Sequence, residues 1–302
     1  MNTEMQRSEK YASYSSDIVS ENTWVKVLRL LIRNKPAMIA FSVFTLVCFS
    51  CLFAPYLTKW KYTEINLEHK LEQPSFTHIF GTDSLGRDML SRILYGGRFT
   101  LKIALTSTLL ATIAGSFLGL VIGYFASWAD AVITPALDVI ASIPVILLAI
   151  VTEATFGWGH GYFMYAMAVA AVPQFASLAS ASVISIKKYE YIEAARALGV
   201  GNTRILLKHV LRNVAPQIIL RFTMGVAEAL LTCTIIGYLQ IGITPPTPEW
   251  GAIVLSAKGQ IRVHPFLMII PCAVIAITVI SINLFGDGLR DALDPANNVI
   301  ER

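Results

Sequence analysis

Six long apolar runs separated by polar stretches dominate this 302-residue chain. Each run approaches the roughly 20 apolar residues that a helix needs to cross a bilayer. None alternates in polarity as the strands of a membrane barrel do. Because backbone polar groups in lipid must be satisfied within each segment, the pattern predicts an all-α integral membrane protein with six transmembrane helices. The predicted spans are 38–53, 103–125, 133–151, 162–186, 218–237 and 266–285.

The composition and the placement of charge agree with a multi-pass protein of the cytoplasmic (inner) membrane. Only 15% of the residues are charged, against about 25% in soluble domains. Basic residues precede the first span, and seven more lie in 187–221, which predicts cytoplasmic N- and C-termini by the positive-inside rule. Segment 58–98 disagrees with that rule, since it falls outside and yet holds Lys59, Lys61, Lys70, Arg87, Arg92 and Arg98.

Polarity also divides the chain into segments. Residues 1–23 lack the apolar core and cleavage site of a signal peptide, and they are predicted to be a flexible cytoplasmic tail. Residues 24–98 hold the first span and an outer loop with a short helix. Residues 99–286 form the main transmembrane domain, with a cytoplasmic loop at 187–217. Residues 287–302 are predicted to be a cytoplasmic C-terminal tail.

Motifs for catalysis or metal binding are missing from the sequence. Cys48 and Cys51 form a C-x-x-C, but they lie inside the first apolar run and are interpreted as small apolar filler. The five histidines show no ligand spacing, and the chain has no phosphate-cradling G-x-x-x-x-G-K-[ST] loop. We therefore expect a chain without catalytic residues, metal or bound cofactor, and without nucleic acid as a partner. Any energy that its activity requires must come from an ion gradient or from a partner.

Three carboxylates lie within or beside the apolar runs. Charges inside a span are costly and usually face an interior or a water-filled path. Asp138 and Glu228 are therefore candidates for lining a pathway or for pinning helices together, and a proton relay is a further alternative. Glu153 lies nearer the outer mouth, which weakens its candidacy.

A charged island at 187–199 separates two apolar runs and must lie in water. Its residues 189–198 favour a helix, which Gly199 can end because glycine tolerates positive φ. Asn202 can then cap a second helix over 203–211. Two alternatives remain open on these grounds, an ordinary amphipathic loop and a docking element. In a docking element, Ala194 and Ala195 would offer a shallow face and Glu193 and Arg196 would offer charge.

The residues Glu193-Ala194-Ala195, followed by Gly199, resemble the EAA loop of ABC-importer permeases. In that family the loop forms a coupling helix that sits in a cleft of the ATPase subunit. Three further blocks are similar to those of the C-type permeases of dipeptide, oligopeptide and nickel importers. These blocks are 80–88 (FGTDSLGRD), 245–251 (PPTPEWG) and 286–295 (GDGLRDALDP). The resemblance implies the type I ABC importer permease fold, with Gly199 as the turn of the coupling loop.

Each of the three blocks also has a physical interpretation. Segment 81–84 is predicted to cap a short helix over 85–95. Pro245 and Pro246 stiffen the outer loop and Trp250 suits an interface belt, so these three residues are a candidate outer gate or binding-protein contact. Segment 286–295 is predicted to end the last span with flexible glycines, followed by a short polar helix capped by Asp287.

Three positions depart from the family pattern. Arg212 stands where the family usually has proline, so the second helix of the loop is expected to run on until Pro216 interrupts it. Cys233 replaces a usual glutamate, and no role is transferred to it. Gln240 replaces a small glycine near the outer end of the fifth span, where it could alter the pore lining.

The resemblance implies a permease subunit that forms half of the membrane pathway of an ATP-driven importer for di- or oligopeptides. The implied partners are a second homologous permease, two ATPases that bind ATP and Mg, an extracytoplasmic substrate-binding protein and membrane lipid. One alternative keeps this architecture and changes the cargo to nickel or another small solute. Another is an autonomous proton-coupled secondary transporter that uses Asp138 and Glu228.

Overall fold

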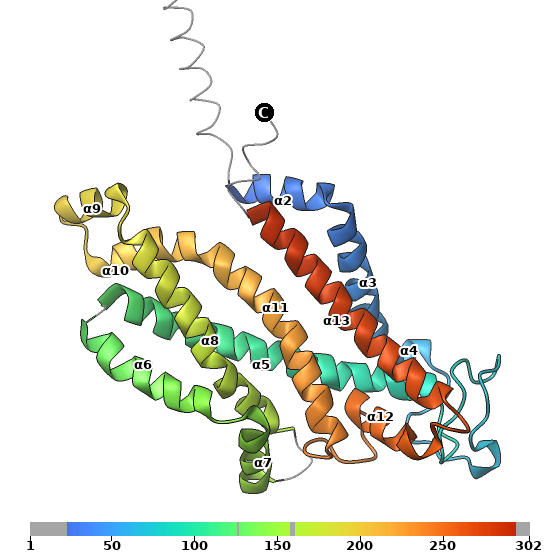
Figure 1. The fold of residues 1–302 in the computed structure, drawn as a ribbon. Coiled ribbons are helices and arrows are strands. Elements are labelled where there is room, and N and C mark those ends of the chain that lie inside the picture. Colours follow the sequence, from blue (N-terminus) through green and yellow to red (C-terminus); the bar gives the residue numbers. More distant parts are fainter. Residues whose placement is uncertain (1–22, 126, 158–160, 294–302) are drawn as a thin grey trace, which may run out of the picture.

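The computed structural model describes residues 23–125, 127–157 and 161–293, and regular structure in these ranges is helical (Figure 1). Residues 1–22 and 294–302 of the two predicted tails lie outside the described residues. The helices are α2 (Thr23–Arg33), α3 (Lys35–Leu52), α4 (Ala54–Leu57), η1 (Leu67–His69), α5 (Met89–Phe125), α6 (Ser127–Ser142), α7 (Val145–Phe156), α8 (Phe163–Ile186), α9 (Glu190–Ala197), α10 (Asn202–Arg204), η2 (Ile205–Val210, a π-helix), α11 (Leu211–Tyr238), α12 (Trp250–Ala257), η3 (Lys258–Gln260) and α13 (Phe266–Leu293).

Five helices in the described part of the chain are long and apolar enough to cross a membrane: α3, α5, α8, the continuous stretch Asn202–Tyr238 and α13. The span predicted at 133–151 is wrong as one straight helix. It is a bent pair, Trp128–Ser142 and Val145–Phe156, whose axes differ by 87°. Pro144 causes the break, because it lacks an N–H and disfavours helical backbone at the residue before it. Counting the bent pair as one span gives six.

Three helices are longer than predicted. α5 begins at Met89 and runs without a break to Phe125, so the separate short helix expected at 85–95 does not exist. The stretch Asn202–Tyr238 is helical throughout and passes Pro216, which does not interrupt it. α13 also continues through the glycines that were expected to end it. At Gly288 a Cβ would lie 2.2 Å from the Cβ of Ala37, so this glycine allows α13 to pack closely on α3.

Close packing of small residues also joins α5 to α8 at the centre of the bundle. Gly115, Gly119 and Gly123 are spaced one helical turn apart and therefore lie on one face of α5. A Cβ on Gly119 would approach the carbonyl oxygen of Ala176 on α8 to 2.3 Å. Without a hydrophobic driving force between helices in lipid, small residues let backbones approach and gain van der Waals contact. α11 packs against α5 and α13 on either side.

The two ends of the bundle carry different elements. α2, α9 and the C-terminal end of α13 lie along the upper edge of Figure 1, whereas α7, α12 and segment 58–88 lie toward the bottom and lower right. Val27 and Leu31 of α2 pack with Leu289 and Ala292 of α13, which fixes those two ends together. The charged island therefore lies at the same end of the bundle as α2 and the end of α13.

Candidate functional site

The charged island forms an exposed helix at one end of the bundle. α9 spans Glu190–Ala197, one residue shorter at each end than the predicted 189–198. Ile192 is fully buried and packs with Ile186 and Ile205, so it anchors the helix to the bundle. Glu193, Ala194 and Arg196 are exposed, and Ala195 is half-buried. The helix therefore has an anchored inner side and a free outer side.

The turn after α9 has the backbone that the sequence predicts. Gly199 has φ +75°, the left-handed conformation that glycine adopts without steric conflict at a helix C-terminus. The prediction that Asn202 caps the next helix is wrong, because the cap position of that helix is Gly201. The Asn202 side-chain oxygen instead accepts a hydrogen bond from the Tyr124 hydroxyl at 2.8 Å.

The segment before α9 also contacts Tyr124. Lys187 Nζ donates to the Tyr124 carbonyl oxygen at 2.7 Å and lies 5.5 Å from the centre of its ring. The Arg196 guanidinium lies 6.0 Å from the same ring. Burial lowers the pKa of Lys187, and the neighbouring charge of Arg196 lowers it further. The whole loop is thus seated on the last residues of α5.

A hollow of about 140 Å³ lies between α5, α7, α8 and α11. Arg221 and Glu228 of α11 line it and form an ion pair, with N–O distances of 2.9 and 3.0 Å. Gln174 of α8 also lines it and accepts a hydrogen bond from Arg221. Sequence reasoning did not identify Arg221 as the partner of Glu228. The sequence feature that could have revealed this pair is Arg221, two helical turns before Glu228 on the same helix.

The other carboxylates lie elsewhere. Asp138 is exposed on α6 and does not line the hollow. Glu153 is fully buried, and one of its carboxylate oxygens accepts a hydrogen bond from the Phe163 N–H at 2.9 Å at the start of α8. It is therefore not at an open outer mouth. The structure does not bring the three carboxylates together.

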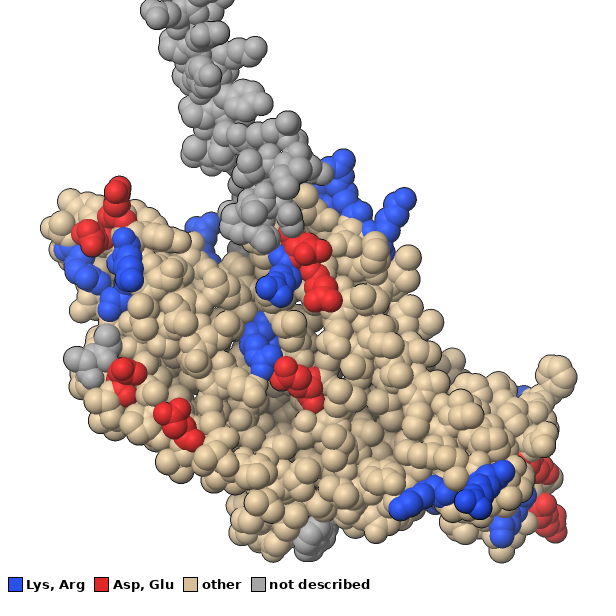
Figure 2. Space-filling model, in the orientation of Figure 1, with Lys and Arg blue, Asp and Glu red and all other residues tan. Residues whose placement is uncertain are grey.

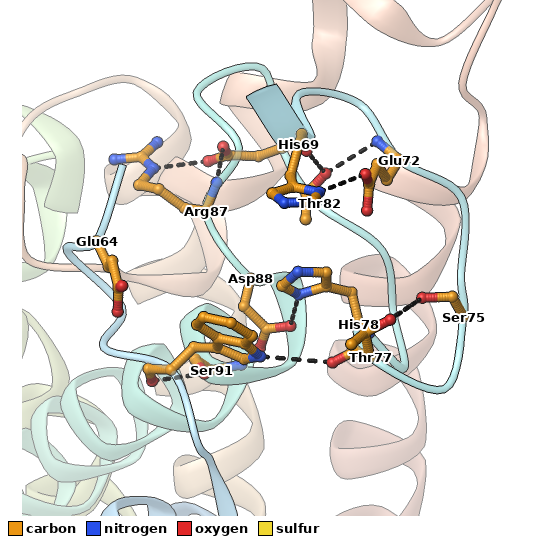
Figure 3. A network of polar contacts seen from close by, with 12 residues as sticks. Glu64, His69, Glu72, Ser75, Thr77, His78, Thr82, Arg87, Asp88 and Ser91 are labelled. Carbon is orange, nitrogen blue, oxygen red and sulfur yellow. Dashed lines mark hydrogen bonds and ion pairs between the residues drawn. The ribbon is translucent and has the colours of Figure 1, made fainter. Parts of the chain in front are cut away.

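Segment 58–88, at the opposite end from α9, is built around buried polar contacts (Figure 3). Asp83 pairs with Arg87 at 2.7 Å and also with Arg92. Burial favours the neutral form of Asp83, but Arg92, the Arg87 N–H and the Arg87 charge outweigh it and hold its pKa below the ordinary value. His78 contacts Asp88 at 2.9 Å, and Asp88 also caps α5 by accepting the Ser91 N–H.

The outer-loop tryptophan is a core residue. Trp250 is fully buried, and its indole N–H donates to the Ile93 carbonyl oxygen at 2.9 Å, so the interface-belt interpretation is wrong. Pro245 and Pro246 are exposed on the loop before it. Beside it, sequence reasoning missed Glu249, which is 1% exposed and caps α12 through the Ala252 N–H at 3.0 Å. Its signal was a single carboxylate directly before an apolar run.

Glu249 is also bonded across the bundle. The Thr100 hydroxyl of α5 donates to its other carboxylate oxygen at 3.1 Å. Burial raises the pKa of Glu249 to about 7, and the hydrogen bonds to its carboxylate oppose that rise. The loop before α12 is therefore held to α5 by a carboxyl group that titrates near neutral pH.

Two family models match this chain. Residues 115–299 match the family model described as binding-protein-dependent transport system inner membrane component. Residues 22–74 match the model of the N-terminal TM domain of oligopeptide transport permease C.

Curated relatives match almost the whole length. The dipeptide transport system permease protein DppC of Alkalihalophilus pseudofirmus is 38% identical over 272 residues, covering 90% of both chains. The glutathione transport system permease protein GsiD of Pectobacterium atrosepticum is 37% identical, covering 90% of this chain and 91% of its own. The di/tripeptide transport system permease protein DppC of Pseudomonas aeruginosa is 35% identical over 87% and 89%.

Among solved structures, the inward-facing MetNI methionine ABC transporter matches with a TM-score of 0.58 and 20% identity. The match covers 68% of this chain and 98% of the MetNI chain. That likeness shows a shared fold. The matched family model and the curated relatives establish that this chain belongs to the family of inner membrane components of binding-protein-dependent transport systems.

Proposed function

We propose that this chain is one of two permease subunits of an ATP-driven importer that carries di- or oligopeptides across the cytoplasmic membrane. Relatives named for dipeptide and glutathione transport support this cargo class. The partners would be a second homologous permease, two ATPases that bind ATP and Mg, and an extracytoplasmic substrate-binding protein. This chain would supply no catalytic group.

The observation that carries the proposal is the exposed outer side of α9. A short helix held by Ile192 and presenting Ala194 outward is suited to enter a cleft of a partner. Lys187 and Asn202, on either side of α9, both bond to Tyr124 of α5, so a displaced α9 would pull on α5 through them. Closure of the ATPase pair would push on α9, and motion would pass through α5 and α8 to exchange inward for outward access. Such a device is allosteric, since it links two sites through two states.

In this arrangement α9 and both termini face the cytoplasm, and segment 58–88 faces outward. The outward assignment agrees with the charge rule better than the sequence alone allows. Arg87 and Arg92 are both paired with Asp83, so they do not act as free cations. Pro245 and Pro246, exposed on the same side, remain candidates for contact with the binding protein.

A proton-driven mechanism gains no support from the carboxylates. Glu228 is paired with Arg221, and Asp138 lies outside the hollow that Glu228 lines. No specific observation favours nickel over peptide.

The proposal is tested by purifying the tagged chain from its native membrane and identifying its companions by mass spectrometry. A second permease and Walker-motif ATPases are expected, and recovery of the chain alone after cross-linking would contradict the proposal. The assembled importer in liposomes should then take up labelled dialanine, and Ni²⁺ uptake in its place would reassign the cargo.

The docking face is tested separately with Ala194→Trp, which places an indole on the exposed side of α9. We expect peptide-stimulated ATP hydrolysis to fall about tenfold, while the chain still inserts in the membrane. Val263→Trp is the matched control, because Val263 is 72% exposed in the loop before α13, at the opposite end of the bundle. Wild-type coupling in the Ala194→Trp importer would show that the ATPase docks elsewhere.

A further inference from the structure

The ion pair of Arg221 and Glu228 lies within the membrane-crossing stretch Asn202–Tyr238. A charged residue near the centre of a span costs about 2.5–3.5 kcal/mol on insertion scales, so such residues usually serve a pathway. Figure 2 shows a blue-and-red group amid tan surface in the part of the bundle that α11 crosses in Figure 1. The pair therefore needs a reason beyond stability.

Helix pinning accounts for Arg221, whose bond to Gln174 joins α11 to α8, but not for Glu228. Both residues belong to α11 and are seven positions apart, so their ion pair joins no two helices. It also lies outside the three- and four-residue spacings that stabilise a helix locally. The Arg221 side chain contacts α8, because it donates to Gln174 and lies 5.7 Å from the centre of the Phe175 ring. The Glu228 side chain is 57% exposed, and both of its oxygens accept from Arg221.

The hollow beside the pair is lined by apolar side chains and by several polar ones. The polar lining residues besides the ion pair are Ser107, Thr108, Thr232 and Gln174. A fixed cation at its wall thus faces a carboxylate that can swing away. When it does so, the two charges stand on Cα atoms about 10 Å apart, from seven residues at 1.5 Å each. The charged ends of an extended dipeptide are about 7 Å apart, which the two side chains can span.

We propose that Arg221, Gln174 and Glu228 form a transit site for the two charged termini of a peptide. Arg221 binds the terminal carboxylate, for which its planar fork is suited, and Glu228 binds the terminal ammonium. The cargo replaces the internal ion pair, so neither protein charge is left unpaired at any stage. Once the cargo leaves, the pair closes again. This inference rests on the proposed peptide cargo.

The test uses the complete importer in liposomes, supplied with the binding protein loaded with labelled dialanine. Single variants leave an unpaired charge and would be harmful under any interpretation. The decisive variants are Arg221→Gln/Glu228→Gln, which removes both charges, and Arg221→Glu/Glu228→Arg, which retains an exchanged ion pair. Asp130→Asn is the matched control, since Asp130 is exposed on α6 and does not line the hollow. Uptake, ATP hydrolysis and recovery of the assembled complex are measured for each.

A transit site predicts that both double variants lose uptake about tenfold or more, as expected for lost hydrogen bonds to charged groups. Hydrolysis stimulated by the loaded binding protein should persist, and Asp130→Asn should import normally. If the ion pair is purely structural, both double variants should take up dialanine normally. Wild-type uptake by either variant therefore overturns the proposal. Failure of both to assemble would also overturn it, by showing a structural role. Absence of dialanine uptake by the wild-type importer would instead refute the proposed cargo.

Discussion

Replacing Glu249 by glutamine should remove a pH-dependent loss of stability. The carboxyl group is 1% exposed, and burial raises its pKa from an ordinary 4.5 to about 7. Each pKa unit corresponds to about 1.4 kcal/mol, so this difference amounts to about 3 kcal/mol. Between pH 4.5 and 7 the folded protein holds a proton that the unfolded chain has released. The contribution of Glu249 to stability is therefore full below pH 4.5 and is lost as the pH rises through 7.

The assay is thermal unfolding of the purified chain in mild detergent, from pH 4.5 to 8.5. Glutamine keeps an oxygen for the Ala252 N–H and carries an amide that the Thr100 hydroxyl can accept, so the cap of α12 should remain. As the pH rises across this range, the apparent melting temperature of the wild type should fall by roughly 5 °C or more relative to that of Glu249→Gln. At pH 8 the variant should be the more stable of the two.

Glu249→Ala is the control for the cap itself. Alanine removes the acceptor for the Ala252 N–H, at a cost of about 1 kcal/mol, and leaves the Thr100 hydroxyl without its carboxylate. It should lower the melting temperature at every pH. If wild type and Glu249→Gln show the same pH dependence, the buried carboxyl group does not titrate near neutral pH and the reasoning is wrong.

Four further variants test separate features of the structure. Gly288→Ala should destabilise the chain by about 1–3 kcal/mol because its Cβ would overlap Ala37, whereas Gly286→Ala, with 3.5 Å to its nearest neighbour, should be tolerated in the same melting assay. Asp83→Asn should cost about 3–5 kcal/mol by leaving two arginines without their carboxylate, and this deficit should shrink in acid because the lowered pKa of Asp83 makes its contribution disappear as pH falls. Gly199→Ala meets no atom within 4 Å, so its cost should be about 1–2 kcal/mol of backbone strain, seen as faster hydrogen exchange in α9 without loss of assembly.

Local patterns predicted the parts of the structure that local chemistry determines. The apolar runs located the spans, and the charged island predicted α9 with its glycine turn at Gly199. Pro144 was equally visible, but it lies inside an apolar run, and hydropathy alone does not register a break in direction. The glycines near the end of α13 were interpreted by their flexibility. Between packed helices they act through the absence of a side chain, which depends on the neighbouring helix.

Polar contacts between distant residues could not be predicted in this way. Glu249 is bonded to Thr100, 149 positions away, and Trp250 to Ile93, 157 positions away. Such partners are chosen by the packing of α12 on α5, which the one-dimensional pattern does not contain. The pair of Arg221 and Glu228 was within reach of helical periodicity, yet only the structure shows that Gln174 of α8 joins it.

The unbroken length of α5 has a mechanical consequence. Its 37 residues form a rod about 55 Å long, nearly twice the thickness of the hydrocarbon core. One tip is fixed by Asp88 in segment 58–88, and the other carries Tyr124 beneath the α9 loop. A rod of that length tilted by about 5° moves its far tip by about 5 Å. A small rotation at the α9 end would thus be felt at the opposite end as a displacement the size of an amino-acid side chain.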